Sequence, residues 1–281
     1  MKTIVYATDF SSNSIDAFKY ALELSSRVKA NLWVIHVFDI SSLSSDLNAP
    51  YLLPRDETYK YKKATLQKFC SDHMDKKYGL KKINTEVVEN DSVIKGIISK
   101  SKEVNASVII TGMKGKNIFE EFIMGSTTKQ LIEKAPCAVL AVPEKNTLNK
   151  LETIVYATDF EQEDIIAISK LIKLFKPFKP KIKITHISTK NEYDGQLQME
   201  WFKEILLQKI LYDNLEFDLF YSDDIFEILN IYLKEVNADL VAMLEREQIG
   251  FLKKLFHKDL VKRMESQTKI PLLSFNEANY K

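Results

Sequence analysis

Three of the seven glycines in the chain, Gly112, Gly115 and Gly125, lie within one window of 14 residues. The surrounding segment, residues 111–127, reads TGMKGKNIFEEFIMGST and ends in Gly125-Ser126-Thr127. A residue without a Cβ lets the backbone approach a ligand closely and adopts positive φ without a clash. If a helix begins at Gly125, its free N–H groups and its dipole favour anionic oxygen atoms, and the two hydroxyls add further hydrogen bonds. The spacing is therefore typical of a phosphate-binding loop.

A carboxylate and a lysine extend this candidate site. Asp9 follows the apolar run at 3–7, and its carboxylate can accept a hydrogen bond from an exocyclic amine or a ribose hydroxyl. Lys114 can supply positive charge at the rim. Two structural alternatives stay open: Asp9 as a helix-cap or Asx-turn residue, and the loop as a plain strand-to-helix turn with a glycine cap.

The elements that must position these residues occur twice. Residues 2–10 read KTIVYATDF and residues 152–160 read ETIVYATDF, an offset of 150. Further on, KEVNASVII and KEVNADLVA match at an offset of 132, so the second copy is 18 residues shorter. The missing stretch is most simply the polar loop expected at 40–57. We therefore expect two related domains, 1–146 and 151–281.

Within each copy, short apolar runs alternate with segments whose apolar residues recur at helical spacing. This pattern is typical of a parallel sheet covered on both faces. The predicted fold class is α/β, with two tandem doubly wound domains, each a five-stranded parallel sheet of order 3-2-1-4-5 with helices on both faces. In the first copy we expect strands at 3–7, 31–38, 83–89, 107–112 and 137–143, and helices at 14–28, 58–78, 92–104 and 125–134.

The strand order predicts where the candidate residues meet. In an open α/β sheet, ligands bind beyond the carboxyl ends of the strands, where the strand order reverses. With order 3-2-1-4-5, the first and fourth strands are neighbours at that point. Asp9 and the segment that begins at Thr111 would then face the same crevice.

These residues resemble a known family. The pattern Gly-x2-Gly-x9-Gly-Ser after the fourth strand, with Ala-Thr-Asp-Phe-Ser after the first, is similar to that of the universal stress proteins, and the similarity covers nearly the whole chain as a tandem pair. Neither a P-loop nor a dinucleotide fingerprint occurs in the sequence. The resemblance implies that the first copy binds ATP through two groups of residues. Adenine would be held by Asp9 and the backbone of Val37, with Ala7 and Thr8 lining the pocket; ribose and phosphates would be held by Gly112, Gly115, Gly125, Ser126 and Thr127.

The resemblance also implies partners. Family members often bind Mg²⁺ together with ATP, although no acidic cluster here independently predicts a metal site. Domains of the family pair through their last strands, so residues 137–143 and 270–275 would form an internal pseudo-dimer. Whether whole chains dimerise again, and which protein reads the nucleotide state, the sequence leaves open.

The second copy departs from the pattern. Aligned by the repeat, Leu244 stands opposite Gly112 and Glu247 opposite Gly115, while His257 and Lys258 replace Gly125 and Ser126. Asp159 survives as the counterpart of Asp9. We therefore expect a structural second copy that does not bind ATP.

Composition excludes several classes of protein. Of the 281 residues, 45% are hydrophobic and 28% charged, with 40 basic and 39 acidic side chains, which argues against a nucleic-acid binder or a disordered chain. Two cysteines are too few for a disulfide scaffold. No apolar run approaches the roughly 18 residues of a membrane span, and the first residues lack the apolar core of a signal peptide. We expect a cytoplasmic protein.

Three functions remain open at this stage. The first is a regulatory stress-response protein whose nucleotide occupancy changes a surface read by a partner. The second is a slow ATPase on the same site, although no general base, arginine finger or metal-binding carboxylate pair is recognisable. The third is an interaction module whose pocket is empty or holds AMP or a cyclic nucleotide.

Overall fold

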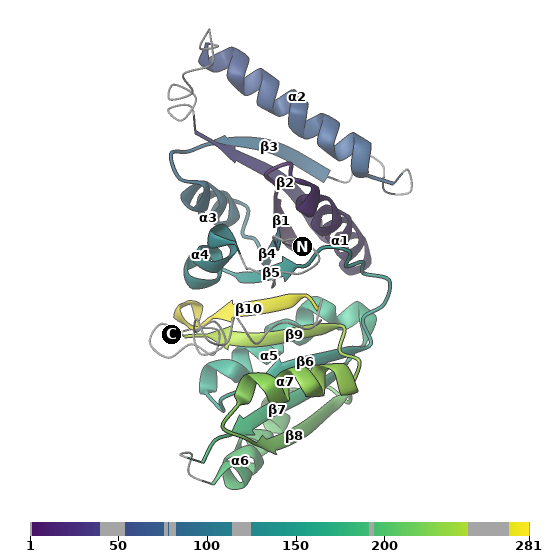
Figure 1. Ribbon diagram of the computed structural model, residues 1–281, viewed down its shortest axis with the longest axis vertical. Helices are drawn as coiled ribbons and strands as arrows, with labels where there is room; N and C mark the ends of the chain where they lie inside the picture. Colours follow the sequence, from purple (N-terminus) through teal and green to yellow (C-terminus); the bar gives the residue numbers. More distant parts are fainter. Residues whose placement is uncertain are drawn as a thin grey trace. The chain divides into compact units, whose positions relative to one another are not determined.

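The computed structural model describes residues 2–39, 54–75, 78, 83–113, 125–190, 194–246 and 270–280. They form two compact units. Unit 1 contains the described residues up to Thr147, and unit 2 contains those from Leu148 onward. Figure 1 shows the elements of both units, coloured along the chain.

Unit 1 is a parallel sheet of strand order β3-β2-β1-β4-β5, as predicted. Helices α1 and α2 contact one face, and α3 and α4 the other (Figure 1). Its elements are β1 (Thr3–Ala7), α1 (Ser12–Val28), β2 (Asn31–Phe38), α2 (Arg55–His73), β3 (Ile83–Glu89), α3 (Val93–Glu103), β4 (Val108–Gly112), α4 (Ser126–Lys134) and β5 (Ala138–Val142).

Unit 2 has the same strand order, β8-β7-β6-β9-β10 when read from the opposite edge. The α/β prediction of two doubly wound parallel sheets is therefore confirmed. Its elements are β6 (Thr153–Ala157), α5 (Gln162–Phe175), β7 (Lys181–Ser188), α6 (Gly195–Lys209), β8 (Leu215–Tyr221), α7 (Ile225–Glu235), β9 (Leu240–Glu245) and β10 (Leu272–Asn276), with short 3₁₀ turns at Lys176–Phe178 and Glu277–Asn279.

One helix boundary differs from the sequence prediction. Helix α2 spans Arg55–His73 rather than 58–78, so the expected loop at 40–57 overlaps its first turn. Pro54 precedes the helix, and Asp56 and Glu57 occupy the first turn. These are favourable residues for a helix start, because proline pre-sets φ and acidic side chains complement the helix dipole. The remainder of the expected loop, 40–53, lies outside the described residues.

The core is built on the central strands. In β1, Ile4, Val5 and Tyr6 are fully buried, and the neighbouring β4 is buried in the same way. The parallel register aligns Tyr6 with Val34 of β2 and with Ile110 of β4. The carboxyl ends of β1, β2 and β4 therefore lie at the same edge of the sheet. This edge carries the candidate residues.

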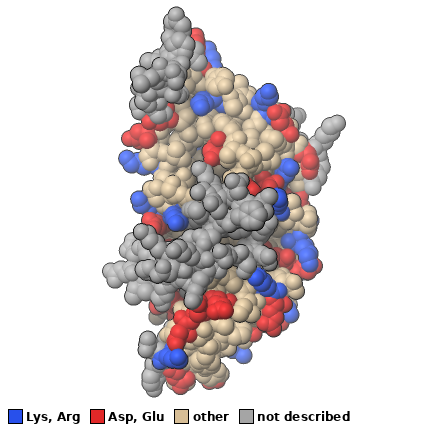
Figure 2. Space-filling model, in the orientation of Figure 1, with Lys and Arg blue, Asp and Glu red and all other residues tan. Residues whose placement is uncertain are grey.

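The surface is mixed in charge. On the face shown in Figure 2, lysine and arginine side chains alternate with aspartate and glutamate, in keeping with the net charge of +1. No helix within the described ranges is both long and apolar enough to cross a bilayer.

The turn after the first strand is the same in both units. Thr8 Oγ1 accepts a hydrogen bond from Phe10 N–H (3.0 Å), and Thr8 N–H donates to Ile35 O (3.0 Å). His36 Nδ1 lies 2.9 Å from Thr8 O, so this nitrogen carries the proton and donates. Phe10 has a φ of 63° and stacks on His36, with ring centroids 4.2 Å apart.

Unit 2 repeats every one of these contacts. Phe160 N–H donates to Thr158 Oγ1 (3.0 Å), Thr158 N–H donates to Thr185 O (3.0 Å) and His186 Nδ1 donates to Thr158 O (2.8 Å). Phe160 has a φ of 66° and lies 4.2 Å from the His186 ring. Left-handed backbone at a bulky residue costs roughly 1–2 kcal/mol. The surrounding contacts therefore hold a strained conformation in both units.

We predict that at position 160 the glycine variant is more stable than the alanine variant, the reverse of the order expected inside a helix. Both substitutions remove the ring that packs on His186, but only Phe160→Gly also removes the left-handed strain. Phe160→Gly should therefore be more stable than Phe160→Ala by about 1 kcal/mol. Urea unfolding followed by Trp201 emission in a Trp33→Phe background measures the difference.

The control is Ile166, which is 41% exposed in the middle of α5. There the alanine variant should be the more stable by about 1 kcal/mol. The same order at both positions would contradict the strain argument.

Candidate functional site

A pocket lies at the carboxyl ends of β1 and β4 in unit 1. It encloses about 150 Å³, which is the volume of an engineered protein cavity that binds a benzene ring. Of the residues predicted for the site, the structure brings together nine: Ala7, Thr8, Asp9, Val37, Thr111, Gly112, Gly125, Ser126 and Thr127. Lys114 and Gly115 lie outside the described residues.

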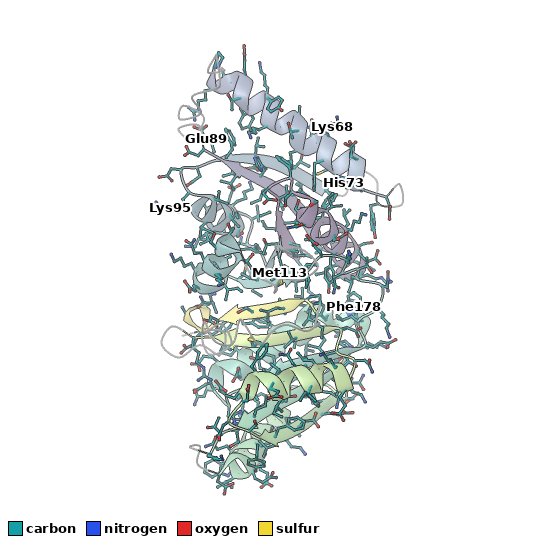
Figure 3. The ribbon with its side chains drawn as sticks, viewed as in Figure 1. Lys68, His73, Glu89, Lys95, Met113 and Phe178 are labelled. Carbon is teal, nitrogen blue, oxygen red and sulfur yellow. The ribbon has the colours of Figure 1, made fainter. Side chains whose placement is uncertain are left out.

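The pocket also has lining residues that the sequence analysis missed. Val93 and Ile97 lie one turn apart on α3, and the i, i+4 spacing of these apolar residues was the available signal. Met113 is buried beyond β4, whereas Lys95 on α3 is exposed (Figure 3). The further lining residues are Ser11, Asn13, Ser14, His36 and Thr128.

Asp9 has one carboxylate oxygen in a turn and one open. Its Oδ1 accepts from the N–H of Ser11 (3.0 Å) and from the Ser11 hydroxyl (2.6 Å), which is an Asx turn. Its Oδ2 has no hydrogen bond to any described residue. The side chain is exposed at the rim of the pocket. The turn role considered for Asp9 is therefore real, and it leaves one acceptor available to a ligand.

His36 contributes no charge to the pocket. Burial lowers the pKa of His36, although the hydrogen bond to Thr8 O opposes this shift. The imidazole is therefore neutral near pH 7. Its Nε2 is enclosed and has no partner among the described residues. The strand-end histidine thus holds the turn rather than supplying a cation for phosphates.

Gly112 is required by packing inside unit 1. A Cβ at this position would come within 2.9 Å of the backbone oxygen of Asn13, at the start of α1. The glycine spacing predicts that Gly112 allows close approach of a ligand, whereas the nearest atoms belong to the chain itself. Glycine here lets α1 close over the end of β4 and form one side of the pocket.

Gly125 has the opposite surroundings. A Cβ there would meet no described atom within 4 Å. Its φ of −59° and ψ of 154° are accessible to any residue. Neither the packing nor the backbone conformation requires glycine, so the missing Cβ leaves room that a ligand can occupy.

The start of α4 favours an anion. Gly125 is its N-cap and gives no side-chain cap, and the first turn contains no acidic residue. The first N–H groups of a helix lack partners within the helix, and the dipole adds partial positive charge. Ser126 and Thr127 add hydroxyls beside them. This end of the pocket therefore suits phosphate or carboxylate oxygen atoms.

We predict that two glycine substitutions separate these roles. Gly112→Ala should lower the free energy of unfolding of unit 1 by about 1–3 kcal/mol, because α1 or β4 must move to accommodate the Cβ. Gly125→Ser, which adds a Cβ but keeps a residue favoured at a helix N-cap, should change it by less than about 0.5 kcal/mol. Urea unfolding followed by Trp33 emission in a Trp201→Phe background measures both. Equal losses would show that Gly125 is also a packing residue.

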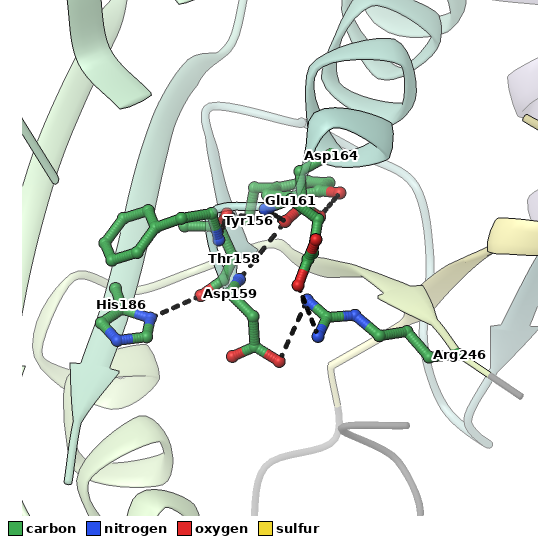
Figure 4. Close-up of polar contacts among 8 residues, drawn as sticks. Tyr156, Thr158, Asp159, Glu161, Asp164, His186 and Arg246 are labelled. Atoms are coloured by element: carbon green, nitrogen blue, oxygen red, sulfur yellow. Dashed lines mark hydrogen bonds and ion pairs between the residues drawn. The ribbon is translucent and has the colours of Figure 1, made fainter. Parts of the chain in front are cut away.

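In unit 2, a buried carboxylate stands at the position that Ser14 occupies at the start of α1 in unit 1 (Figure 4). Asp164 replaces Ser14 and is 1% exposed. Its Oδ1 accepts from the Tyr156 hydroxyl (2.6 Å) and its Oδ2 from the Thr158 hydroxyl (2.9 Å). The N–H groups of Glu161 (3.1 Å) and Asp159 (3.3 Å) also donate to Oδ2.

An arginine lies beside this cluster. Arg246 Nη2 is 3.3 Å from Asp159 Oδ2, and Arg246 Nη1 is 3.2 Å from Glu161 Oε1. Leu244 is buried where unit 1 has Gly112. Glu247, His257 and Lys258, which also entered the comparison of the two copies, lie outside the described residues.

Asp164 should make unit 2 sensitive to pH. Burial raises its pKa to about 6, and the hydrogen bonds and Arg246 only partly oppose the shift. Because the pKa is higher in the folded state, stability is greatest below the pKa of the unfolded chain and falls as pH rises through about 4 to 6. Between pH 4 and pH 7 the wild type should lose about 2 kcal/mol relative to Asp164→Asn.

Urea unfolding at the two pH values, followed by Trp201 emission in a Trp33→Phe background, measures the loss. The exposed Asp213→Asn variant is the control and should follow the wild type. A difference between wild type and Asp164→Asn that does not change with pH would contradict the prediction.

Within the described residues, no group of three or more His, Cys, Asp or Glu side chains is placed to hold a metal ion. The fold and the pocket define a class of protein: tandem doubly wound α/β domains with a strand-end pocket in the first. A family model described as "Universal stress protein family" matches residues 1–143, half of the chain. The chain belongs to the universal stress protein family.

Similar proteins extend this assignment. A universal stress protein of Methanocaldococcus jannaschii is 28% identical over 148 residues, which cover 50% of this chain and 81% of that protein. A relative in Staphylococcus epidermidis, also named as a universal stress protein, is 30% identical over 150 residues, 50% of this chain and 83% of its own. Among solved structures, a universal stress protein from Archaeoglobus fulgidus has the same fold over 98% of both chains, with a TM-score of 0.72 and 16% identity.

Proposed function

We propose that unit 1 binds one adenine nucleotide, with ATP as the first candidate, and that unit 2 is a structural half without a nucleotide site. The supporting observation is that two complementary ends occur in one pocket. Asp9 offers an open acceptor at one end, and the uncapped start of α4 offers donors and partial positive charge at the other. A nucleotide has a hydrogen-bond donor on its base and an anion at its far end.

The walls between these ends fit a flat base and a sugar. Val37, Val93 and Ile97 provide an apolar surface on one side. Gly96 lets α3 pack closely here, since a Cβ at Gly96 would be 2.6 Å from Val37 Cγ1. The room beside Gly125 lies where the phosphates would enter the first turn of α4. AMP or a cyclic nucleotide satisfies the same chemistry with a shorter anion.

The proposal assigns a regulatory rather than catalytic role. Occupancy of the pocket would be read by a partner protein at the surface around the site. Mg²⁺ would accompany ATP through the phosphates rather than through a protein carboxylate cluster. A steady release of phosphate in the presence of Mg-ATP would instead favour a slow ATPase.

The direct test is to denature freshly purified protein and identify any released nucleotide by chromatography and mass spectrometry. About one adenine nucleotide per chain would support the proposal, and its chemical form would distinguish ATP from AMP or a cyclic nucleotide. No retained nucleotide, together with no gain in thermal stability on addition of Mg-ATP, would overturn it.

We predict that Asp9→Asn weakens binding of ATP by at least about tenfold, or about 1.4 kcal/mol. Asparagine keeps the oxygen that accepts from Ser11, but it replaces the open acceptor with an amide donor, so the exocyclic amine of adenine loses its partner. Isothermal titration calorimetry with Mg-ATP measures the change.

Asp159→Asn is the matched control, because it makes the same chemical change at the same position of the repeat in unit 2. It should leave the affinity for ATP unchanged. Equal weakening by both substitutions, or by neither, would contradict the assignment of the site to unit 1.

A further inference from the structure

The two units differ in what meets the carboxylate after the first strand. The repeat places Asp159 opposite Asp9, and both follow the same threonine turn. In unit 1 the Oδ2 of Asp9 has no partner among the described residues. In unit 2 the Oδ2 of Asp159 is bound by Arg246 at 3.3 Å. Among the described residues, this oxygen therefore has no partner in unit 1 and is bound by an arginine in unit 2.

Arg246 is held from two sides. Its two terminal nitrogens reach different carboxylates, Asp159 and Glu161, and its side chain is only 20% exposed. A planar guanidinium can bridge two acceptors in this way, whereas an ammonium group is a single point of charge. The residue directly follows β9, so the contact fastens the end of that strand to the turn between β6 and α5.

Asp164 explains why Asp159 is available to the arginine. In unit 1 the N–H of Ser11 donates to the Asp9 carboxylate. In unit 2 the equivalent N–H, that of Glu161, donates to Asp164 instead (3.1 Å). The N–H of Glu161 is thus bound by Asp164 of α5 rather than by Asp159. The carboxylate of Asp159 contacts Arg246 instead. The aspartate at the position of Ser14 and the arginine after β9 therefore act on the same turn: Asp164 binds its N–H group, and Arg246 binds its carboxylate.

We propose that Arg246 is an internal ligand of unit 2. Its guanidinium occupies the carboxylate that unit 1 keeps open, so the strand-end position of unit 2 is closed by a cation of the chain itself. The unit is thereby held in one state that does not respond to nucleotide. The internal contact stands on the geometry of unit 2 alone; only the contrast with an open unit 1 rests on the proposed function.

The test is hydrogen–deuterium exchange, read by mass spectrometry on the full chain. In Arg246→Ala, peptides that cover residues 158–165 and 240–246 should exchange at least tenfold faster than in the wild type, while peptides of unit 1 are unchanged. Added guanidinium, far below denaturing concentrations, should restore protection, and sodium chloride of the same ionic strength should not. Arg246→Lys should restore it only in part, because lysine replaces two separate guanidinium nitrogens, held in one plane at a fixed spacing, with a single nitrogen.

Arg55→Ala is the matched control, because it removes the exposed pair of Arg55 with Glu89 (2.8 Å) in unit 1. It should leave exchange in unit 2 unchanged. If Arg246→Ala unfolds unit 2, Arg246→Gln, which keeps two hydrogen-bonding atoms, takes its place in the same comparison. Unchanged exchange in the Arg246 variant, or equal rescue by sodium chloride, would overturn the proposal.

Mg-ATP added to the wild type separates this proposal from the proposed function. Protection of peptides around residues 7–14 without change at 158–165 is the expected result. Protection at 158–165 would overturn the internal ligand. Absence of protection at 7–14 would count against nucleotide binding by unit 1 and leave the result for Arg246 unaffected.

Discussion

The turn that carries the chain from the first strand into the first helix fixes the frame on which the rest of each unit depends. In Thr8 and Thr158 the side-chain oxygen accepts a hydrogen bond from the N–H two residues ahead, and the backbone oxygen accepts one from a histidine on the next strand. A phenylalanine in left-handed conformation covers that histidine in both units. The strain costs free energy, so packing and hydrogen bonds must outweigh it. This frame decides where the following carboxylate lies.

The same frame supports two different chemical outcomes. With Ser14 at the start of α1, the N–H of Ser11 donates to one oxygen of Asp9, and the other oxygen has no partner among the described residues. With Asp164 in that position, a buried charge collects four donors and the neighbouring carboxylate turns to Arg246. Burying a carboxylate is costly unless donors surround it, which accounts for the density of hydrogen bonds there. The backbone is shared, and the polar side chains decide whether the position is open or filled.

The two glycines that line the pocket of unit 1 have different surroundings. The spacing of Gly112 and Gly125 predicted that both belong to one site, and both line the same pocket, but the sequence could not say why each glycine is there. Gly112 is set by the backbone of Asn13, a contact between an element near the start of the chain and one a hundred residues later. Gly125 meets no described atom, and its backbone conformation is open to any residue. Only three-dimensional neighbours separate these two explanations.

The sequence by itself determined the architecture. Alternating apolar runs and helical periodicity predicted the strands and the doubly wound parallel fold, because burial imposes a visible period. The residues expected at the site came from the glycine spacing, the position of Asp9 after the first strand and the resemblance to the family, and nine of them line the pocket. Helix α2 was misplaced by a few residues, since its polar first turn resembles a loop. What only the tertiary structure decided was the state of each carboxylate: the open oxygen of Asp9, the bond from Arg246 to Asp159 and the donors around Asp164. The contact of Arg246 with Asp159 joins segments far apart in the sequence, and the hydrogen bonds to Asp9 and Asp164 depend on the exact conformation of a turn. No local pattern in the chain encodes these distances.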